Sequence, residues 1–426
     1  MAQPHVCLLC TQHVAGNVRI TGKLGAVMAE AGFRVTWVGP DLEPAPEGYD
    51  GIDFRFYRSP QNRLRRIFNT HRAERLAATV DDVDVYFAGH PDTARSAARL
   101  AQRTGARAAL DLHEIYHEDQ LNRWSRGLAK RTAGRIIHRW IAGLLDRMDL
   151  VVYSGDSVLA PYPNVKSPAV RARNAPLRAF ADGPPADVLP RDGGPITIMH
   201  GKASLSRGTK PILLAAAEAT KRMGRLVRVL CFPLFAPHEH FGEVELRALA
   251  ASTGVPDCLD LRQPVPFRRM PDLLRQCDLG ALMFPPEHGA QFLPCRLFEY
   301  MALGIPFLYP PYCTEMREIA EAERCGVACD PGDPQAVAEV IVNLCGDPDK
   351  ARELGRRGRE AFFTRCNFNT DAQPMLEQIR RWAQERRSGR DKGGAFPGGR
   401  EPDISLAPAP RHRENTPSDF HSHRSR

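Results

Sequence analysis

The stretch PCRLFEYMALGIP, from Pro294 to Pro306, is the most informative segment of this chain. It predicts a short helix with sharp ends, because proline suits the first turn of a helix and Gly304 suits its carboxyl-terminal cap. Arg296 and Glu299 are three residues apart, so their side chains are neighbours on one helical face. A guanidinium can pair with phosphate oxygens, while a carboxylate accepts both vicinal hydroxyls of a ribose. The pair therefore suits a nucleotide diphosphate, and an ordinary surface ion pair is the alternative explanation.

Short apolar runs alternate with helical patterns on both sides of this stretch. At the amino terminus a strand, a helix from about Val18 to Ala31 and a second strand fit within about 35 residues, the size of one right-handed parallel unit. Residues 174–195 are rich in Pro, Gly and Asp and indicate an interdomain linker, after which the alternation restarts. The sequence therefore predicts an α/β fold of two Rossmann-like, doubly wound domains that face each other across a cleft. Strands are predicted at 5–10, 34–39, 83–88, 106–112 and 150–153 before the linker, and at 196–200, 226–232, 279–284 and 306–309 after it.

The stretch PCRLFEYMALGIP also resembles the signature of glycosyltransferase family 4 (group 1), whose members have the two-domain GT-B fold and retain the anomeric configuration. In that family a helix of the form P-x-K/R-x-x-E-Y/A-M-A-x-G-x-P holds the nucleotide-sugar donor. The resemblance implies that Glu299 binds the donor ribose, with Arg296 and Leu297 beside it. The first glutamate of the family's paired motif is replaced here by Gln291. The loop residues that remain candidates for contact with the donor sugar are Glu287, His288, Gly289, Ala290 and Gln291.

A second similar stretch, HGKASLSRGTKPILLAAAE, runs from residue 200 to residue 218 and matches the family's first turn of the donor-binding domain. Its Gly201, Lys202 and Arg207 correspond to the family's glycine-basic and basic-glycine pairs, which imply diphosphate contacts. The two cations lie between a predicted strand and a predicted helix, so they and the free N–H groups of the helix would converge on a pyrophosphate. Two solvated loop cations are the alternative.

The N-terminal domain contributes three further stretches that resemble the family, beginning at Gly16, at residue 84 and at residue 109. Gly16 lies in the loop expected to face the donor. His113 follows a predicted buried strand, so we expect it to hydrogen-bond a donor hydroxyl or an acceptor, with Asp111 orienting the turn. A structural hydrogen bond is the alternative role for a histidine at a strand end. The candidates on the acceptor side are His90, Asp92 and Glu114.

The resemblance assigns roles to the two domains. Residues 1–185 are expected to form the acceptor-side domain, and residues 186–365 the domain that binds the nucleotide sugar. Residues 366–387 are expected to form a C-terminal helix that packs back on the N-terminal domain. In residues 388–426 apolar side chains are sparse and Gly, Pro, Arg, Ser and His dominate, which predicts a disordered tail.

The resemblance also implies a mechanism that needs neither a metal ion nor a cofactor. Lys202 and Arg207 would stabilise the charge that grows on the leaving diphosphate, so with His113 they are the predicted catalytic residues. Metal-dependent sugar transfer uses an Asp-x-Asp motif, which occurs twice, at 82–84 and 347–349. The first leads into an apolar strand and the second begins a helix, where acidic residues favour the helix dipole. Both therefore have structural explanations.

Composition excludes several other classes of protein. A chain of 426 residues with 43% hydrophobic and 25% charged residues is typical of a soluble globular protein. The net charge of +8 is too modest to indicate nucleic-acid binding. There is no signal-peptide pattern and no apolar run of about 18 residues, so export and membrane-spanning helices are not expected. The eleven cysteines have no paired spacing apart from an apolar Cys7 to Cys10 run, which favours a reducing cytoplasm.

The acceptor and the location are the least determined properties. Residues 122–141 interleave six Lys or Arg residues with Trp, Leu and Ile, so this segment either binds the anionic inner face of the plasma membrane or forms a long helix with one face in the core. The acceptor is accordingly a glycan, a lipid-linked glycan or a small molecule, as in polysaccharide biosynthesis. Two alternatives stay open: a nucleotide-sugar 2-epimerase of the same fold, and a non-catalytic glycan-binding protein, suggested by Gln291.

Overall fold

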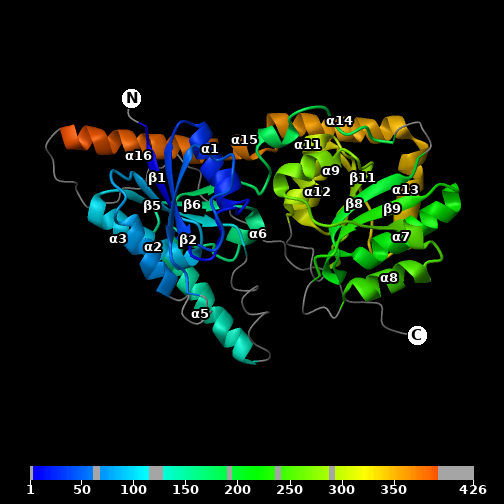
Figure 1. The fold of residues 1–426 in the computed structure, drawn as a ribbon, viewed down its shortest axis with the longest axis horizontal. Helices are drawn as coiled ribbons and strands as arrows, with labels where there is room; N and C mark the ends of the chain where they lie inside the picture. The colour runs from blue at the N-terminus through cyan, green and yellow to red at the C-terminus, as the bar shows by residue number, and fades with distance from the viewer. Residues whose placement is uncertain are drawn as a thin grey trace.

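Two α/β lobes lie side by side in this protein (Figure 1). The computed structural model describes residues 3–60, 68–114, 128–189, 194–235, 241–286 and 293–391, with the backbone alone described at 128–132 and 390–391. Each lobe contains one parallel sheet with helices packed around it. The predicted fold of two Rossmann-like, doubly wound domains is therefore confirmed.

The N-lobe is built on a seven-stranded sheet with the order β3-β2-β1-β4-β5-β6-β7. Its inner strand β1 is buried over its whole length, as expected for a parallel strand covered on both faces. The strands are β1 (His5–Leu9), β2 (Arg34–Pro40), β3 (Ile52–Tyr57), β4 (Val85–Ala88), β5 (Arg107–Leu112), β6 (Leu150–Tyr153) and β7 (Ala169–Arg171). The helices are α1 (Ala26–Glu30), which continues a π-helix at Ile20–Gly25, α2 (Asn69–Ala77), α3 (Pro91–Thr104), α5 (Leu128–Leu145) and α6 (Asp156–Leu159).

The C-lobe repeats this plan with a six-stranded sheet of order β10-β9-β8-β11-β12-β13. Its strands are β8 (Ile196–Lys202), β9 (Val227–Phe232), β10 (Leu259–Leu261), β11 (Leu279–Ala281), β12 (Phe307–Tyr309) and β13 (Gly326–Ala328). Its helices are α7 (Thr209–Met223), α8 (Glu243–Ser252), α9 (Met270–Leu274), α11 (Cys295–Leu303), α12 (Thr314–Glu323), α13 (Pro334–Gly346) and α14 (Pro348–Thr364). Two helices follow, α15 (Phe368–Asp371) and α16 (Gln373–Asp391).

The order of strands reverses at one place in each sheet. In the N-lobe, β1 pairs with β2 on one side and with β4 on the other, so that Val6 lies opposite Val35 and Val85. In the C-lobe, β8 lies between β9 and β11 in the same way. Ligands of open parallel sheets bind at the carboxyl ends of strands next to such a reversal. The loops after β1, β4, β8 and β11 are therefore the places to examine for a site.

The last helices return to the first lobe. Phe368 of α15 and Met375, Ile379 and Trp382 of α16 are buried in one of the two N-lobe cores. Arg386 holds the far end of α16, because its guanidinium donates to the carbonyl of Val83 and to the carboxylate of Asp84. Figure 1 shows α16 lying along the N-lobe.

The structure changes three details of the sequence-based picture. Residues 175–189, which the sequence assigns to the interdomain linker and mostly to the first domain, pack into the C-lobe core through side chains such as Phe180 and Val188. Helix α16 extends to Asp391, so the predicted tail starts later than residue 388, and residues 392–426 lie outside the described residues. Four edge strands were not predicted: β7, β10 and β13 have three residues each, too few for a periodic signal, and β3 was overlooked.

Candidate functional site

Helix α11 contains the predicted pair of charged residues, and both are largely removed from solvent. Pro294 occupies the cap before the helix, and Gly304 ends it with a φ of 73°. Nη1 of Arg296 lies 2.7 Å from Oε2 of Glu299, and the two side chains are 20% and 4% exposed. The pair is therefore not the surface ion pair that we considered as the alternative.

The two close atoms of this pair are buried and form an ion pair with each other. Within the described residues, neither Nη1 of Arg296 nor Oε2 of Glu299 makes a hydrogen bond with acceptable geometry, despite their short separation. Removing charges from water without satisfying their hydrogen bonds costs free energy.

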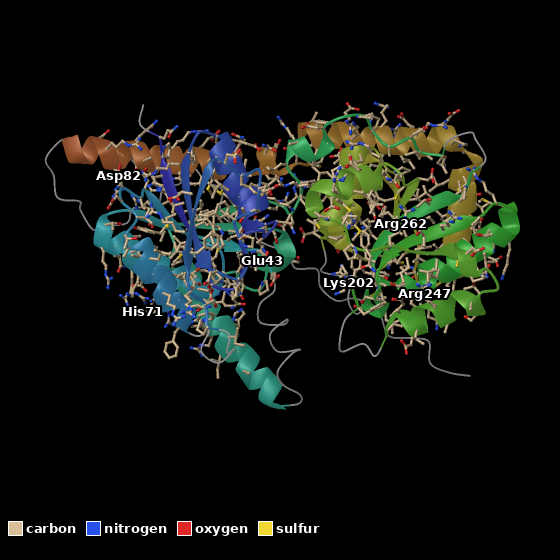
Figure 2. All side chains as sticks on the ribbon, viewed as in Figure 1. Glu43, His71, Asp82, Lys202, Arg247 and Arg262 are labelled. Atoms are coloured by element: carbon tan, nitrogen blue, oxygen red, sulfur yellow. The ribbon has the colours of Figure 1, made fainter. Side chains whose placement is uncertain are left out.

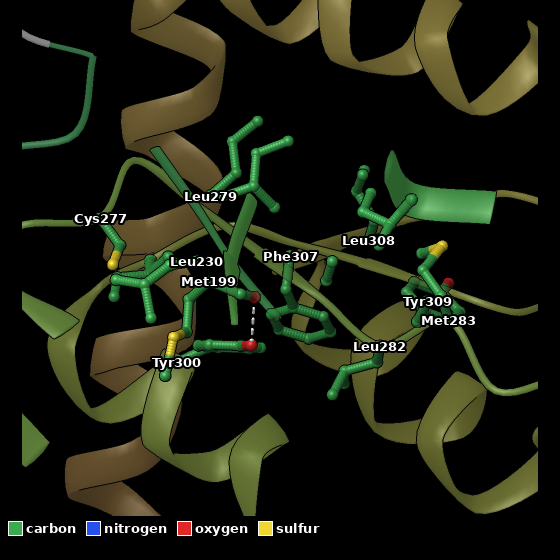
Figure 3. Close-up of a cluster of buried hydrophobic side chains, with 14 of the residues drawn as sticks. Met199, Leu230, Cys277, Leu279, Leu282, Met283, Tyr300, Phe307, Leu308 and Tyr309 are labelled. Carbon is green, nitrogen blue, oxygen red and sulfur yellow. Dashed lines mark hydrogen bonds between the residues drawn. The ribbon is translucent and has the colours of Figure 1, made fainter. Parts of the chain in front are cut away.

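The sequence of α11 also explains its position at the end of β8. The hydroxyl of Tyr300 donates to the carbonyl of Met199 over 2.7 Å (Figure 3). The Tyr300 ring lies so close to Gly280 of β11 that a β carbon there would meet it at 2.4 Å. Leu297 is fully buried in the C-lobe core, so any ligand contact that it makes must come from its backbone.

The predicted diphosphate residues form the turn between β8 and α7. Gly201 has a φ of 96°, and a β carbon added there would lie 3.7 Å from a guanidinium nitrogen of Arg296. Lys202 ends β8, and Figure 2 shows it on the side of the C-lobe that faces the N-lobe. Arg207 closes the following turn, with its guanidinium 5.8 Å from the centre of the Phe284 ring. Cations from this turn and from α11 thus occupy one end of the sheet.

His200 is buried directly before this turn. Its Nε2 lies 3.0 Å from the hydroxyl of Thr209 at the start of α7. Burial, followed by the nearby charge of Arg207, lowers the pKa of His200 to about 4. The imidazole is therefore neutral near pH 7.

Three histidines lie together at the carboxyl ends of β1, β4 and β5. The ring centre of His13 is 6.0 Å from that of His90 and 5.5 Å from that of His113. Asp92 contacts Nδ1 of His90 at 2.9 Å and also accepts from the hydroxyl of Thr11. Burial, with the neighbouring His113 and His90, lowers the pKa of His13 to about 4, so this ring is neutral at pH 7.

Asp111 holds His113 in place. Its Oδ2 lies 2.7 Å from Nδ1 of His113, and both of its oxygens accept from the guanidinium of Arg19. Burial alone would favour a protonated carboxyl, but the charge of Arg19 and the hydrogen bonds from His113 and Arg19 outweigh it and lower the pKa of Asp111. An ionised Asp111 fixes the imidazole with its proton on Nδ1, which leaves Nε2 as the acceptor nitrogen.

The carboxyl ends of the two sheets face each other. The carboxylate of Glu315, at the start of α12, accepts from the backbone amides of Asp156 and Ser157 over 3.1 and 2.9 Å, and these two residues follow β6 of the other lobe. Lys23, on the π-helix of the N-lobe, is buried, and burial lowers its pKa to about 8 although Cys295 of α11 opposes the effect. The start of α11 therefore lies within electrostatic range of the N-lobe.

The remaining predicted residues divide into two groups. Gly16 is exposed in the loop after β1, next to Glu43, which Figure 2 shows on the side of the N-lobe facing Lys202. Glu114 follows His113 and is exposed. The predicted residues that lie outside the described residues are Glu287, His288, Gly289, Ala290 and Gln291.

Sequence reasoning missed four residues that the structure places at this site or along its borders: His13, Arg19, Lys23 and Glu315. The stretch from Gly16 to Gly25 was recognised only as a helix with a family-like start. Two basic residues four apart on that helix, Arg19 and Lys23, were a signal of a shared face. Nothing local marks Glu315, since its partners are 158 and 159 residues away.

The two Asp-x-Asp motifs have structural roles. Asp84 accepts from the backbone amide of His5 and from Arg386, and Asp347 caps α14 by accepting from the amide of Lys350. Within the residues that the structure describes, no group of three or more His, Cys, Asp or Glu side chains is arranged to hold a metal ion.

One further cavity, of about 590 Å³, lies at the seam of the lobes. Tyr49 and Glu30 line it from the N-lobe, and Phe267 and Arg268 line it from the C-lobe. It shares no lining residue with the groups described above.

Comparison with known proteins gives the context for this site. Residues 244–377 match a family model described as glycosyl transferase-like, so the chain carries a glycosyl transferase-like domain that includes α11. No curated protein sequence is significantly similar to the chain.

Solved structures share the whole two-lobed architecture. Sucrose-phosphate synthase from Thermosynechococcus elongatus has a TM-score of 0.67 at 15% identity, over 90% of this chain and 100% of that one. Anabaena HepE in complex with UDP and glucose has a TM-score of 0.66 at 15% identity, over 89% and 100% of the two chains. Trehalose 6-phosphate synthase from Burkholderia multivorans has a TM-score of 0.59 at 10% identity, over 94% and 100%. The chain therefore has the GT-B fold.

Proposed function

We propose that this protein is a family 4 glycosyltransferase, which moves a sugar from a nucleotide diphosphate sugar to an acceptor with retention of configuration and without a metal ion. The observation that carries the proposal is the buried pair of Arg296 and Glu299. Both residues lie in the glycosyl transferase-like domain, and their side chains are only 20% and 4% exposed. A donor ribose would satisfy the carboxylate, and a donor phosphate would satisfy the guanidinium.

The chemistry of this proposal is mainly electrostatic. Departure of the diphosphate breaks the bond between the anomeric carbon and the phosphate oxygen. The acceptor hydroxyl forms the new bond on the same face of the sugar, and its proton passes to an oxygen of the departing diphosphate. Lys202 and Arg207 stabilise the charge that develops on the leaving diphosphate, which is usually the largest contribution such a site makes. His113, with Nε2 as its acceptor nitrogen, binds a hydroxyl of the donor sugar or of the acceptor.

A uridine nucleotide is the first donor to test. HepE, which has the same fold, was solved in complex with UDP and with UDP-glucose. The fold alone does not carry donor identity across 15% sequence identity, so the screen should also include GDP-, TDP- and ADP-sugars.

The decisive experiment compares donor binding by the natural protein and by Glu299→Gln, an isosteric change that removes the charge of the carboxylate. Thermal shift and slow donor hydrolysis are measured across the nucleotide-sugar panel. We expect one donor to stabilise the natural protein and the variant to lose that stabilisation while keeping its melting temperature without ligand. Glu353→Gln on α14, where Glu353 pairs with Arg356 and Arg357, is the matched control. If the natural protein neither binds nor hydrolyses any donor, the active-enzyme proposal fails and a non-catalytic role is favoured.

Retention and metal independence have their own measurements. Proton NMR of the first product formed should show the anomeric configuration of the donor, and inversion would contradict the family assignment. Activity should be unchanged by EDTA, whereas restoration by added Mg²⁺ or Mn²⁺ would overturn the metal-free mechanism.

We further propose that the protein works in the cytoplasm, with α5 against an anionic membrane and a lipid-linked glycan as the acceptor. Figure 1 shows α5 projecting from the body of the N-lobe. Its Ile136 and Trp140 are 64% and 37% exposed, and Arg135 and Arg139 beside them are exposed. Among the described residues no helix is long and apolar enough to cross a membrane. The free thiols of all eleven cysteines agree with a reducing compartment.

Liposome flotation tests this location. The natural protein should float with phosphatidylglycerol vesicles, and a variant with both Ile136→Ser and Trp140→Ser should not. Val244→Ser removes an even more exposed apolar side chain, 77% accessible, from α8 of the C-lobe and should still float. Equal flotation of all three proteins would show that α5 is not the contact, and no flotation would remove the membrane proposal.

A further inference from the structure

Arg19 connects the candidate catalytic histidine to the chain segment that joins the two lobes. Its Nε and Nη2 donate to the two oxygens of Asp111 over 3.2 and 2.8 Å. Its Nη1 donates to the carbonyl of Ala172 over 2.8 Å and to that of Arg173 over 3.2 Å. Residues 172–174, the interlobe crossover, are where the chain leaves the N-lobe core and enters the C-lobe core. One buried guanidinium is therefore bound both to the carboxylate that holds His113 and to the crossover.

A second cation reinforces the same connection. The π-helix is formed by hydrogen bonds from Gly22 to Asn17 and from Leu24 to Arg19, each spanning five residues. Lys23, one turn after Arg19, donates to the carbonyl of Asn174 over 2.7 Å. The π-helix thus holds the carbonyls of all three crossover residues. Such short π-helical turns occur often at functional sites.

The crossover in turn contacts the helix of the donor pair. Arg173 donates from its backbone and side chain to Asp371, which lies where the chain returns from the C-lobe to the N-lobe. The Arg173 guanidinium is 5.5 Å from the centre of the Phe298 ring, and Phe298 directly precedes Glu299 on α11. The contacts therefore run without a break from His113 through Asp111, Arg19 and the crossover to α11.

We propose that Arg19 is a positioning residue, which fixes the orientation and protonation of His113 with reference to the interlobe crossover. Arg19 keeps Asp111 ionised and holds both of its oxygens, so Asp111 can present His113 in one tautomer and one direction. Because the same guanidinium binds the crossover, this direction is set relative to α11 and not only to the N-lobe. The expected effect on kcat rests on the proposed function, whereas the expected effect on the tautomer of His113 does not.

The test uses Arg19→Gln and Arg19→Lys, with Arg171→Gln as the matched control. Arg171 lies on the strand that leads into the crossover and pairs with Asp156, but it does not contact Asp111. Arg19→Gln leaves a buried carboxylate without its cation, which destabilises the fold, so the double variant Arg19→Gln with Asp111→Asn is used to restore neutrality. Arg19→Lys keeps the charge but cannot reach both oxygens and both carbonyls.

The first readout is independent of any transferase activity. Nitrogen-15 NMR of the histidine side chains, with His113→Gln for assignment, reports the tautomer and the titration of His113. In Arg19→Lys we expect a mixture of tautomers in place of the single form with the proton on Nδ1. In Arg19→Gln we expect a mixture of tautomers as well, because neither oxygen of Asp111 is then held by a guanidinium. An unchanged His113 signal in both variants overturns the proposal whatever the enzyme does.

The second readout is kinetic, with the donor identified by the screen above. In Arg19→Lys we expect kcat to fall about 100-fold, as for a misplaced catalytic group, while the donor KM stays near that of the natural protein. Arg171→Gln should match the natural protein in both measurements. An active natural protein whose Arg19 variants keep its kcat would refute the positioning role, whereas an inactive natural protein refutes only the proposed function.

Discussion

A β carbon placed on Gly355 would lie 1.9 Å from the carbonyl oxygen of Gly304, so the backbones of α14 and of the end of α11 are in direct contact. Gly304 is the residue that ends the donor helix, with a φ of 73°. The position of the Arg296 and Glu299 pair therefore depends on a glycine in a different helix, more than fifty residues further along the chain.

Gly355→Ala should consequently destabilise the C-lobe and weaken donor binding. The added methyl group overlaps backbone rather than a flexible side chain, so we expect a loss of about 3 kcal/mol of unfolding free energy. Urea denaturation measures this loss, and thermal shift with donor measures the displacement of α11.

Gly143→Ala in α5 is the matched control, because nothing lies within 4 Å of its added methyl group. That control should be slightly stabilising, by about 0.5 to 1 kcal/mol. Equal unfolding free energies for Gly355→Ala and Gly143→Ala would contradict the close contact between Gly355 and Gly304.

Gly208→Ala should disrupt the turn of the diphosphate cations. Gly208 has a φ of 77°, and a β carbon there would lie 1.7 Å from the carbonyl oxygen of Met283. Gly224→Ala separates the backbone strain from the steric overlap, because Gly224 has a φ of 62° but nothing within 4 Å of an added β carbon. The control should cost only the left-handed backbone penalty of about 1 to 2 kcal/mol. Gly208→Ala should cost clearly more and should abolish donor stabilisation in the thermal-shift assay. Equal losses in unfolding free energy would show that the Met283 contact relaxes without cost.

Acidification should destabilise the protein in part through His200. Burial, then Arg207, lowers the folded-state pKa of His200 from 6.5 to about 4. Because the folded protein binds this proton less tightly than the unfolded chain, protonation favours unfolding. The contribution of His200 to the free energy of unfolding is therefore complete above pH 6.5 and is lost as the pH falls to about 4. The full effect is about 3 kcal/mol.

Melting temperatures of the natural protein and of His200→Asn between pH 7.5 and 4.5 test this expectation. The variant should be less stable at pH 7.5 but should lose less stability on acidification. His71→Asn changes an exposed histidine of α2, labelled in Figure 2, and should leave the pH dependence as it is. Parallel curves for the natural protein and His200→Asn would mean that His200 does not contribute.

Arg386→Ala should release the end of α16 from the N-lobe. Arg386 is buried and donates to the carboxylate of Asp84 over 3.2 Å and to the carbonyl of Thr104 over 3.1 Å. Breaking a buried ion pair from one side costs about 3 to 5 kcal/mol, and the remaining contact of Arg387 with Asp84 should keep the loss near the lower figure. Arg387→Ala, which removes a partly exposed partner of the same carboxylate, should cost less than about 1 kcal/mol. Limited proteolysis within α16, together with urea denaturation, would distinguish the two variants.

The sequence predicted most of the fold because its signals are local. Buried parallel strands such as β1 and β9 are continuous apolar runs, and they were located to within about two residues. The edge strands β7, β10 and β13 were missed because three residues carry no period, and pairing with a neighbour is what makes them strands. The composition of the linker likewise indicated where the chain passes between the lobes. It did not indicate that residues 175–189 enter the C-lobe core.

The candidate site divides in the same way. The sequence by itself determined that Arg296 and Glu299 share a face of one helix, because a spacing of three residues fixes that neighbourhood wherever the helix lies. Only the tertiary structure decided that the pair is buried, that Arg19 reaches Asp111 across 92 residues and Ala172 across 153, and that Gly355 touches Gly304. The physical reason is that helical geometry acts over a few residues, whereas these contacts exist only once two sheets and the crossover between them have brought distant segments together.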